Sequence, residues 1–200
     1  MGPPKAPASG PPPNLRERSL PIRSITRQWV RLHLCRHHAK NFGRTGEHRF
    51  DAPRKEYGVL YAGQDEAGAF VEVFGDPLDV RLLALRPLKQ FCLSAVRAKR
   101  PLRLVDLTGP GLRRLGVDAR LTGGDDYQCS QPWARALWGH PDAPDGLLYR
   151  ARHDPSRQAV AIFDRAAAAI RTKKLCRLTD NPHTLARLLD LYGFGLIIGK

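Results

Sequence analysis

The sequence lacks the features that mark membrane and secreted proteins. It contains no run as long as the roughly 18 apolar residues that a transmembrane helix needs. Its amino terminus has no apolar core ahead of a cleavage site, which argues against a classical signal peptide. We therefore expect a cytoplasmic protein with no membrane partner.

Cysteine is scarce, and its spacing does not suit a metal ion. The chain has four cysteines, which are Cys35, Cys92, Cys129 and Cys176. They lie far apart and form no CxxC pair, so a zinc site is not expected. His37 and His38 adjoin Cys35, but no second pair of ligands follows at a matching distance. We expect reduced thiols in the core, no metal ion and no cofactor.

Acidic residues are few compared with basic ones. There are 19 Asp and Glu residues against 33 Lys and Arg residues, so the formal net charge is +14. Such a surface attracts phosphates, nucleic acid or an acidic partner without choosing among them. No basic helix interleaved with aromatic residues and no nucleic-acid motif occurs. Nucleic-acid binding is therefore an alternative that rests on charge alone, and we do not expect it.

The composition changes near the amino terminus. Residues 1–15 consist mainly of Pro, Gly, Ala and Ser and cannot bury a core. The remaining length suits one compact domain. We therefore expect a disordered Pro/Gly-rich tail over residues 1–25 and a single domain over residues 26–200.

Short apolar runs between turn residues predict a fold with many strands. The runs lie at residues 29–34, 59–62, 80–85, 91–96, 102–107, 147–151 and 159–163. Helices are predicted at residues 65–75 and 181–193, with a third helix that starts at Ser130 as N-cap and has Pro132 in its first turn. Residues 194–198 are either a last strand, which we favour, or an interface. Many strands with few helices predict a mixed, largely antiparallel α+β fold.

The segment over residues 47–75 combines a charged lead-in, a short strand and a helix. Apolar residues recur along this helix at steps of three and four, and Glu72 adjoins the stripe that they form. A carboxylate on the rim of a helix packed against a strand can lie in a cleft, where burial and cations tune its pKa. Periodicity alone favours the plainer interpretation, in which Glu72 is solvated and Arg49 is a surface residue.

A set of sequence fragments, in order along the chain, favours instead a functional interpretation of Glu72 and Arg49. The first half has Arg49-Phe50, Gly58 to Ala62, Ala69 and Glu72, and the second half has Leu104 to Thr108, Tyr127, Gln131, Trp133-Ala134, Asp145 to Tyr149, Arg152 to Asp154 and Ala161 to Phe163. In order and spacing these fragments resemble the RES domain, a bacterial family named for an arginine, a glutamate and a serine. The resemblance covers roughly residues 29–163.

The resemblance implies a fold, an activity and partners. The fold is similar to that of the ADP-ribosyltransferase toxins, a split antiparallel sheet with flanking helices and with NAD in a central cleft. The activity is the degradation of NAD as a substrate, by hydrolysis or by phosphorolysis with inorganic phosphate. The protein partner is an Xre-type antitoxin, which would make this chain the toxin of a toxin–antitoxin system.

The resemblance also assigns roles to single residues. Arg49 matches the family arginine, Glu72 the family glutamate, Tyr61 a tyrosine between them, and Arg31 an upstream arginine that faces the nucleotide. Loss of nicotinamide from NAD leaves an oxocarbenium-like ribose, which a carboxylate stabilises, as in glycosidases. We therefore expect Glu72, Arg49 and Tyr61 to be catalytic residues and the two arginines to clamp the pyrophosphate.

One position departs from the family pattern. Tyr149-Arg150-Ala151-Arg152 stands where the family has Tyr-x-Ser-Arg, so Ala151 replaces the named serine of the ribose-binding site. Ser130 and Ser156 are nearby in sequence, but a helix cap and a loop explain them better. Two alternatives stay open: transfer of ADP-ribose to a macromolecule, and a catalytically weakened module that binds NAD or a partner.

Overall fold

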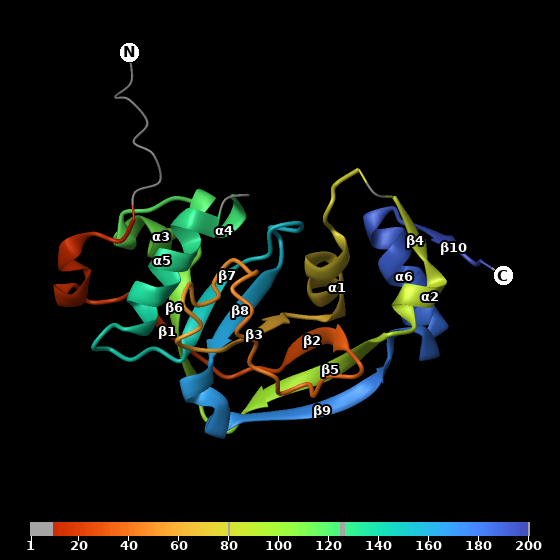
Figure 1. Ribbon diagram of the computed structural model, residues 1–200, viewed down its shortest axis with the longest axis horizontal. Coiled ribbons are helices and arrows are strands. Elements are labelled where there is room, and N and C mark those ends of the chain that lie inside the picture. Colours follow the sequence, from red (N-terminus) through yellow and green to blue (C-terminus); the bar gives the residue numbers. More distant parts are fainter. Residues whose placement is uncertain (1–9, 80, 125–126, 200) are drawn as a thin grey trace, which may run out of the picture.

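One large mixed sheet forms the body of the protein (Figure 1). The computed structural model describes residues 10–79, 81–124 and 127–199. The strand order is β1-β6-β7-β8-β3-β2-β5-β9. The strands are β1 Ile22–Ile25, β2 Trp29–Leu34, β3 Val59–Gly63, β5 Phe91–Ala98, β6 Leu102–Leu107, β7 Gly146–Arg150, β8 Gln158–Phe163 and β9 Ile170–Arg177. All neighbours are antiparallel except β6 and β7, which confirms the predicted α+β, largely antiparallel fold.

The helices gather at three places along this sheet. They are α1 Glu66–Phe74, α2 Leu85–Leu88, α3 Pro110–Leu115, α4 Arg120–Gly123, α5 Tyr127–Trp138 and α6 Pro182–Tyr192, with short 3-10 turns at Pro13–Glu17, Asp164–Ala169 and Leu178–Asp180. In Figure 1, α3, α4 and α5 lie beside β6, α6 lies at the opposite end, and α1 lies between them. A small parallel sheet of β4 Leu82–Ala84 and β10 Gly195–Ile197 sits next to α6.

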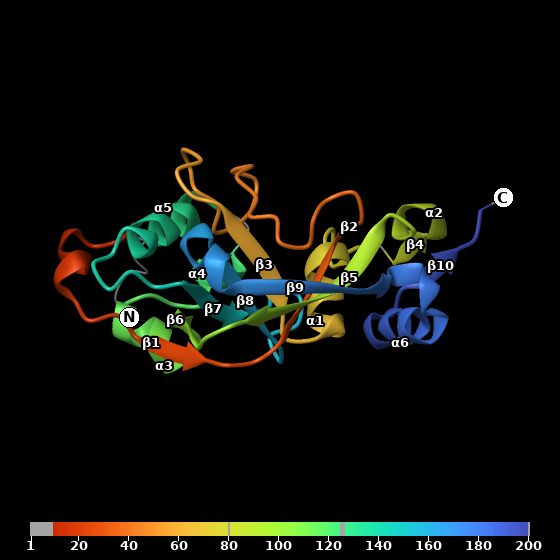
Figure 2. The same ribbon diagram turned by 90° about the horizontal axis from the view of Figure 1, so that it is seen from below.

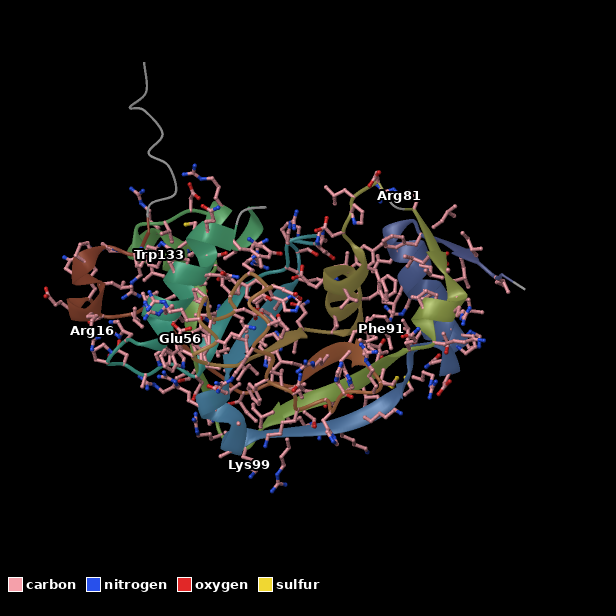
Figure 3. All side chains as sticks on the ribbon, in the orientation of Figure 1. Arg16, Glu56, Arg81, Phe91, Lys99 and Trp133 are labelled. Atoms are coloured by element: carbon pink, nitrogen blue, oxygen red, sulfur yellow. A yellow bond between two sulfur atoms is a disulfide. The ribbon has the colours of Figure 1, made fainter. Side chains whose placement is uncertain are left out.

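Alternation along the strands divides the core into clusters on the two faces of the sheet. Val59 of β3 faces the cluster built around Trp133 of α5, whereas the next residue, Leu60, faces the cluster around Trp29 on the other side. Trp133 is 1% exposed, and Figure 3 places it at the end of the molecule that carries α5. A further cluster packs Phe70 of α1 and Leu188 of α6 against β2 and β5. Helix α1 is thereby fixed against the middle of the sheet.

Local signals define the ends of α1 and α6 as the sequence predicts. Asp65 precedes α1, and its carboxylate accepts a hydrogen bond from the backbone N–H of Gly68 at 2.8 Å. Asn181 caps α6 by accepting from the N–H of Thr184 at 3.1 Å. Gly193 ends α6 with φ +68°, a left-handed conformation that suits glycine. Residues 194–198 contribute β10, the favoured alternative.

The start of α5 differs from its prediction. The helix includes Tyr127, three residues before Ser130, so the prediction of Ser130 as N-cap is wrong. The Ser130 hydroxyl instead donates to the carbonyl of Tyr127 at 3.4 Å within the helix. Pro132 therefore lies in the helix interior. The apolar stripe predicts the body of this helix, but its first turn is mostly polar and carries no apolar periodicity.

Two strands at the edges of the sheet were not predicted, and one predicted strand is shorter. β9 carries four Lys and Arg residues among eight, because an outer strand exposes most of its side chains, so no apolar alternation marks it. Figure 2 shows β9 running beside β5 along the molecule. The strand predicted at residues 80–85 shrinks to β4, and the chain then turns into α2. Val80 lies outside the described residues.

The amino-terminal boundary also needs correction. Residues 1–9 lie outside the described residues, but residues 10–25 pack on the domain. Leu15 and Leu20 are buried in the cluster around Trp133, and β1 pairs with β6. The carbonyl of Leu15 is also 3.1 Å from the Nε2 atom of His140. The boundary at residue 25 is therefore wrong, since apolar residues spaced among polar ones still reach the core.

Two cysteines contradict the expectation of reduced thiols. Cys35 and Cys92 form a disulfide with a Cα–Cα distance of 5.0 Å, although 57 residues separate them in the chain. Cys35 follows β2 and Cys92 lies on the adjacent β5, so strand pairing brings them together. Cys129 and Cys176 do not take part in this disulfide and are partly buried. Within the described residues, no cluster of His, Cys, Asp and Glu could hold a metal ion, and no helix is long and apolar enough to cross a membrane.

Candidate functional site

A cavity of about 280 Å³ lies where α1 meets the middle of the sheet. Its walls come from segments that are far apart in the sequence. They include Arg31 of β2, His48 and Arg49 of the loop before β3, Tyr61 of β3, Glu72 of α1, Tyr127 of α5, Tyr149 of β7, and Arg152 and His153 of the following loop. Four of the five residues singled out in the sequence, Arg31, Arg49, Tyr61 and Glu72, thus line one cavity.

Glu72 is presented by a helix that packs unusually close to its neighbouring strand. A Cβ atom added to Gly63, the last residue of β3, would lie 2.5 Å from the backbone N of Ala69 in α1. The glycine therefore permits this approach. The Oε1 atom of Glu72 accepts hydrogen bonds from the backbone N–H groups of Arg152 at 2.7 Å and His153 at 3.5 Å. The helix and the loop after β7 together orient the carboxylate.

Burial raises the pKa of Glu72 above its ordinary value. The two backbone N–H donors and the nearby side chains of His153 and Arg49 oppose this rise, because they favour the charged form. Among the described residues, the second carboxylate oxygen, Oε2, has no hydrogen-bond donor from the protein. Glu72 therefore combines a fixed oxygen with one that a ligand can use.

Arg49 also lines the cavity and is buried, with 8% of its surface exposed. Its Nη1 atom donates to the carbonyl of Gly124 at 2.6 Å, and its guanidinium lies 5.1 Å from the centre of the Tyr127 ring. Burial lowers the pKa of Arg49. Within the described residues Arg49 forms no ion pair with a carboxylate, so its charge is available to an anionic ligand.

Arg31 reaches the cavity from β2 and is held by the loop that follows the strand. Its Nη1 atom donates to the carbonyls of Asn41 at 2.7 Å and Ala39 at 3.2 Å. Burial lowers the pKa of Arg31 to about 10. Together with Arg49 it gives the cavity a positive character, which suits phosphate groups.

Tyr61 contributes its ring to the cavity rather than a free hydroxyl. The hydroxyl donates to Oδ1 of Asp51 at 2.9 Å and accepts from the backbone N–H of Phe50 at 3.0 Å. Burial and the charge of Asp51 raise the pKa of Tyr61 well above its ordinary value, so the phenol keeps its proton. The ring also contacts His48, with the centroids 5.6 Å apart. Tyr61 can therefore offer its ring to a ligand, whereas its hydroxyl already has two protein partners.

Ala151 does not line the cavity, although Tyr149 and Arg152 do. Its side chain is 1% exposed, and its N–H donates to the carbonyl of Arg157 at 3.0 Å. Ser130 and Ser156 are not cavity residues either. The hydroxyl of Ser156 donates to Asp154 in the loop after β7. Neither serine therefore supplies a hydroxyl in place of the one that Ala151 lacks.

Several cavity residues received no role from the sequence. Tyr127, Tyr149, Arg152 and His153 all belong to fragments of the family resemblance, so that signal could have found them. Tyr149 is 4% exposed, and burial next to Glu72 raises its pKa. The Nη1 atom of Arg152 lies 3.2 Å from a carboxylate oxygen of Asp76 at the rim. Asp51, beneath the cavity, had no such signal, because no periodicity marks it.

The chain is similar to known proteins over much of its length. Residues 24–184 match the family model of the RES domain. A relative from Sinorhizobium fredii, named probable toxin y4kH, is 27% identical over 115 residues, which are 58% of this chain and 90% of the relative. The fold is also similar to a chain in the crystal structure of the M. tuberculosis MbcT–MbcA toxin–antitoxin complex. That similarity has a TM-score of 0.61 and 15% identity, and covers 82% of this chain and 92% of the other.

Proposed function

Because this chain belongs to the RES domain family, we propose that it is an enzyme that breaks the bond between nicotinamide and ribose in NAD. The observation that carries the proposal is the meeting of Glu72 with Arg31 and Arg49 in one cavity. One carboxylate in the same cavity as the buried guanidinium of Arg49 and the partly buried guanidinium of Arg31 suits a ligand that joins a cationic ribose centre to a pyrophosphate.

Glu72 stabilises the reacting ribose. Departure of neutral nicotinamide leaves positive charge on the ribose carbon and ring oxygen, and a nearby carboxylate lowers the energy of that state. Oε1 is held by the N–H groups of Arg152 and His153, so Oε2 accepts from a ribose hydroxyl. A carboxylate held before the reaction begins needs little reorganisation during it.

The arginines and Tyr61 bind the rest of the substrate. The guanidinium of Arg49 makes charge-assisted contacts to the pyrophosphate, and Arg31 adds its field from β2. The ring of Tyr61 packs against the nicotinamide ribose, since its hydroxyl is already bonded to Asp51 and Phe50. Either water or inorganic phosphate then accepts the ADP-ribosyl group.

The biological role we propose is that of a cytoplasmic toxin in a toxin–antitoxin system. Support comes from the relative named a probable toxin and from the similar fold in a toxin–antitoxin complex. An antitoxin protein is accordingly the proposed partner. Degradation of NAD would account for toxicity, because NAD is needed throughout metabolism.

One observation favours a second function. Ala151 is buried and supplies no hydroxyl where the family has serine. A lost hydrogen bond costs about 0.5–1.5 kcal/mol, and more if a buried partner is left unpaired. The second function is therefore binding of NAD, or of a partner protein, with little or no turnover.

The deciding experiment follows NAD and its products by chromatography and mass detection, with and without phosphate. Wild-type protein is expected to release nicotinamide together with ADP-ribose, or with ADP-ribose 1″-phosphate when phosphate is the acceptor. Glu72→Gln should lower turnover about 100-fold or more while the protein stays folded. The matched control is Glu66→Gln, on the first turn of α1, whose carboxylate pairs with Arg187 at the surface.

The results separate the alternatives. Full turnover by Glu72→Gln contradicts the assignment of Glu72. Binding of NAD by the wild type without nicotinamide release favours the second function, whereas labelling of an added protein or nucleic acid indicates ADP-ribosyl transfer.

A further inference from the structure

The loop over residues 45–51 places Arg49 in the cavity without forming a helix or a strand. Buried backbone groups in such a loop need partners other than a regular ladder. Arg49 itself makes its side-chain bond to Gly124, outside the loop. The position of Arg49 therefore depends on how the loop backbone is anchored.

Asp51 is the main anchor of this loop. Its side chain is 1% exposed. Oδ2 accepts from the hydroxyl of Thr45 at 2.9 Å and from the backbone N–H groups of Gly46 at 3.1 Å and His48 at 3.3 Å. Oδ1 accepts from the hydroxyl of Tyr61 at 2.9 Å. Four donors on one buried carboxylate offset the cost of removing its charge from water.

The carbonyl groups of the same loop have a separate anchor. Nε2 of Gln131, on α5, donates to the carbonyls of Gly46 at 2.8 Å and His48 at 3.1 Å. Asp51 thus accepts hydrogen bonds from N–H groups of the loop, and Gln131 donates hydrogen bonds to its carbonyl groups. The two anchors differ in one respect, because only Asp51 is also bonded to a residue of the sheet that lines the cavity.

Asp51 determines the orientation of the Tyr61 hydroxyl. The Tyr61 oxygen accepts from the N–H of Phe50 at 3.0 Å, and its proton points to Asp51. One carboxylate therefore connects the wall that carries Arg49 to the wall that carries Tyr61. Within the described part of the chain, Asp51 has no Lys, Arg or His partner, so hydrogen bonds alone hold it.

We propose that Asp51 is a positioning residue, which holds Arg49 and Tyr61 in the geometry that binds the substrate pyrophosphate and ribose. This inference rests on the proposed function of the cavity. Asp51 does not line the cavity, so its effect reaches the ligand only through the loop and Tyr61.

The structure distinguishes two substitutions at this position. Asp51→Ala removes all four hydrogen-bond acceptor contacts. Asp51→Asn keeps an oxygen for the N–H groups of Gly46 and His48 and turns its NH₂ group toward the Tyr61 oxygen, which can accept. The phenol proton must then point elsewhere, but the loop stays anchored. The amide variant should therefore rescue most of what alanine loses.

The first readout is amide hydrogen exchange of residues 45–51, which needs no ligand and no turnover. Exchange at Gly46 and His48 should rise about tenfold or more in Asp51→Ala and by a much smaller factor in Asp51→Asn. Asp145, which is also buried and pairs with Arg100 without lining the cavity, provides the matched control variants Asp145→Ala and Asp145→Asn. Unchanged exchange at residues 45–51 in Asp51→Ala overturns the proposal.

The second readout is the dissociation constant for NAD, measured by calorimetry in a Glu72→Gln background that prevents turnover. Asp51→Ala should weaken binding about 10- to 100-fold, and several-fold less when Arg49→Ala is already present, since part of the effect of Asp51 on the ligand is transmitted by Arg49. An equal loss with and without Arg49 would overturn the positioning role and leave a general effect on the fold.

Two features keep the outcome decisive. If Asp51→Ala does not fold, Tyr61→Phe tests the same network, because it removes the hydroxyl that accepts from the N–H of Phe50 and donates to Asp51, and unchanged exchange at residues 45–51 in that variant contradicts the proposal. If the wild type neither binds nor consumes NAD, the proposed function fails, while the exchange experiment still decides whether Asp51 holds the loop.

Discussion

Two charged groups that line the cavity, Glu72 and Arg49, are held by different kinds of structure. Glu72 lies on a regular helix that Asp65 caps and that packs directly on β3. Arg49 lies on an irregular loop whose backbone is bonded to the side chains of Asp51 and Gln131. The first arrangement depends on packing, and the second depends on a few buried hydrogen bonds.

This difference predicts different responses to substitution. A substitution in the contact between α1 and β3 should lower the stability of the protein. It should also move Glu72 together with the whole helix, because a helix shifts as a unit. A change in the loop network should loosen Arg49 and weaken ligand binding with a smaller loss of stability. The predictions below test whether the two walls respond separately.

The largest loss of stability is expected when the disulfide between Cys35 and Cys92 is reduced. Cys35 begins the loop whose carbonyls hold Arg31. Reduction should lower the unfolding free energy by about 2–4 kcal/mol, measured by urea denaturation with and without dithiothreitol. It should also speed amide exchange in residues 36–41 but not in α1.

Two variants control for the reductant. The double variant Cys35→Ser/Cys92→Ser should be insensitive to dithiothreitol, and Cys129→Ser, at a cysteine outside the disulfide, should respond like the wild type. Equal stability of the oxidised and reduced wild type would contradict the prediction.

Gly63→Ala should act on α1, the helix that carries Glu72. The new Cβ would meet the backbone of Ala69 at 2.5 Å and of Gly68 at 2.8 Å, so α1 must move away from β3. We expect a loss of about 1–3 kcal/mol in thermal or urea unfolding and a parallel loss of turnover as Glu72 shifts. In the control Gly43→Ala the nearest atom is 3.9 Å away, and stability should hardly change. A Gly63→Ala protein as stable as the wild type would show that α1 can move without cost.

Gln131→Ala should act only on the loop over residues 45–51, which carries Arg49. It removes hydrogen bonds to the carbonyls of Gly46 and His48, at a cost of about 0.5–1.5 kcal/mol. Binding of NAD should weaken although α1 is untouched. Arg135→Ala, on the same helix with an exposed ion pair to Glu56, should change unfolding by less than about 1 kcal/mol and leave binding intact. If amide exchange in α1 rises as much as amide exchange in the loop over residues 45–51, the two regions do not respond independently.

The smallest effect concerns pH. Because the pKa of Glu72 is raised in the folded protein by burial, its ionisation disfavours folding. Relative to Glu72→Gln, wild-type stability should be highest below the ordinary glutamate pKa of about 4.5 and fall as pH rises through the raised pKa. Turnover should show the opposite trend, rising over the same window as the carboxylate forms. The pH dependence of unfolding in both proteins tests this sign, and parallel curves would contradict it.

Sequence patterns were most informative where a residue's place depends on its near neighbours. The cap at Asp65, the stripe through Phe70 and the glycine at position 63 are all local, so the helix that carries Glu72 was predicted with the correct ends. Edge strand β9 was missed, because exposed side chains follow no apolar alternation. The predicted start of α5, at Ser130, lies too far along the chain, because the first turn of this helix is polar.

By itself the sequence determined the α+β class, the positions of most strands along the chain and the helix that presents Glu72. It also carried the family resemblance that singled out Arg31, Arg49 and Tyr61. Only the tertiary structure decided what holds those residues: the bond from Tyr61 to Asp51, the contact of Gln131 with a loop 85 residues away, and the pairing of Cys35 with Cys92. The physical reason is range, since local propensities act over a few residues, whereas the partners of a buried polar group are set by how distant segments pack.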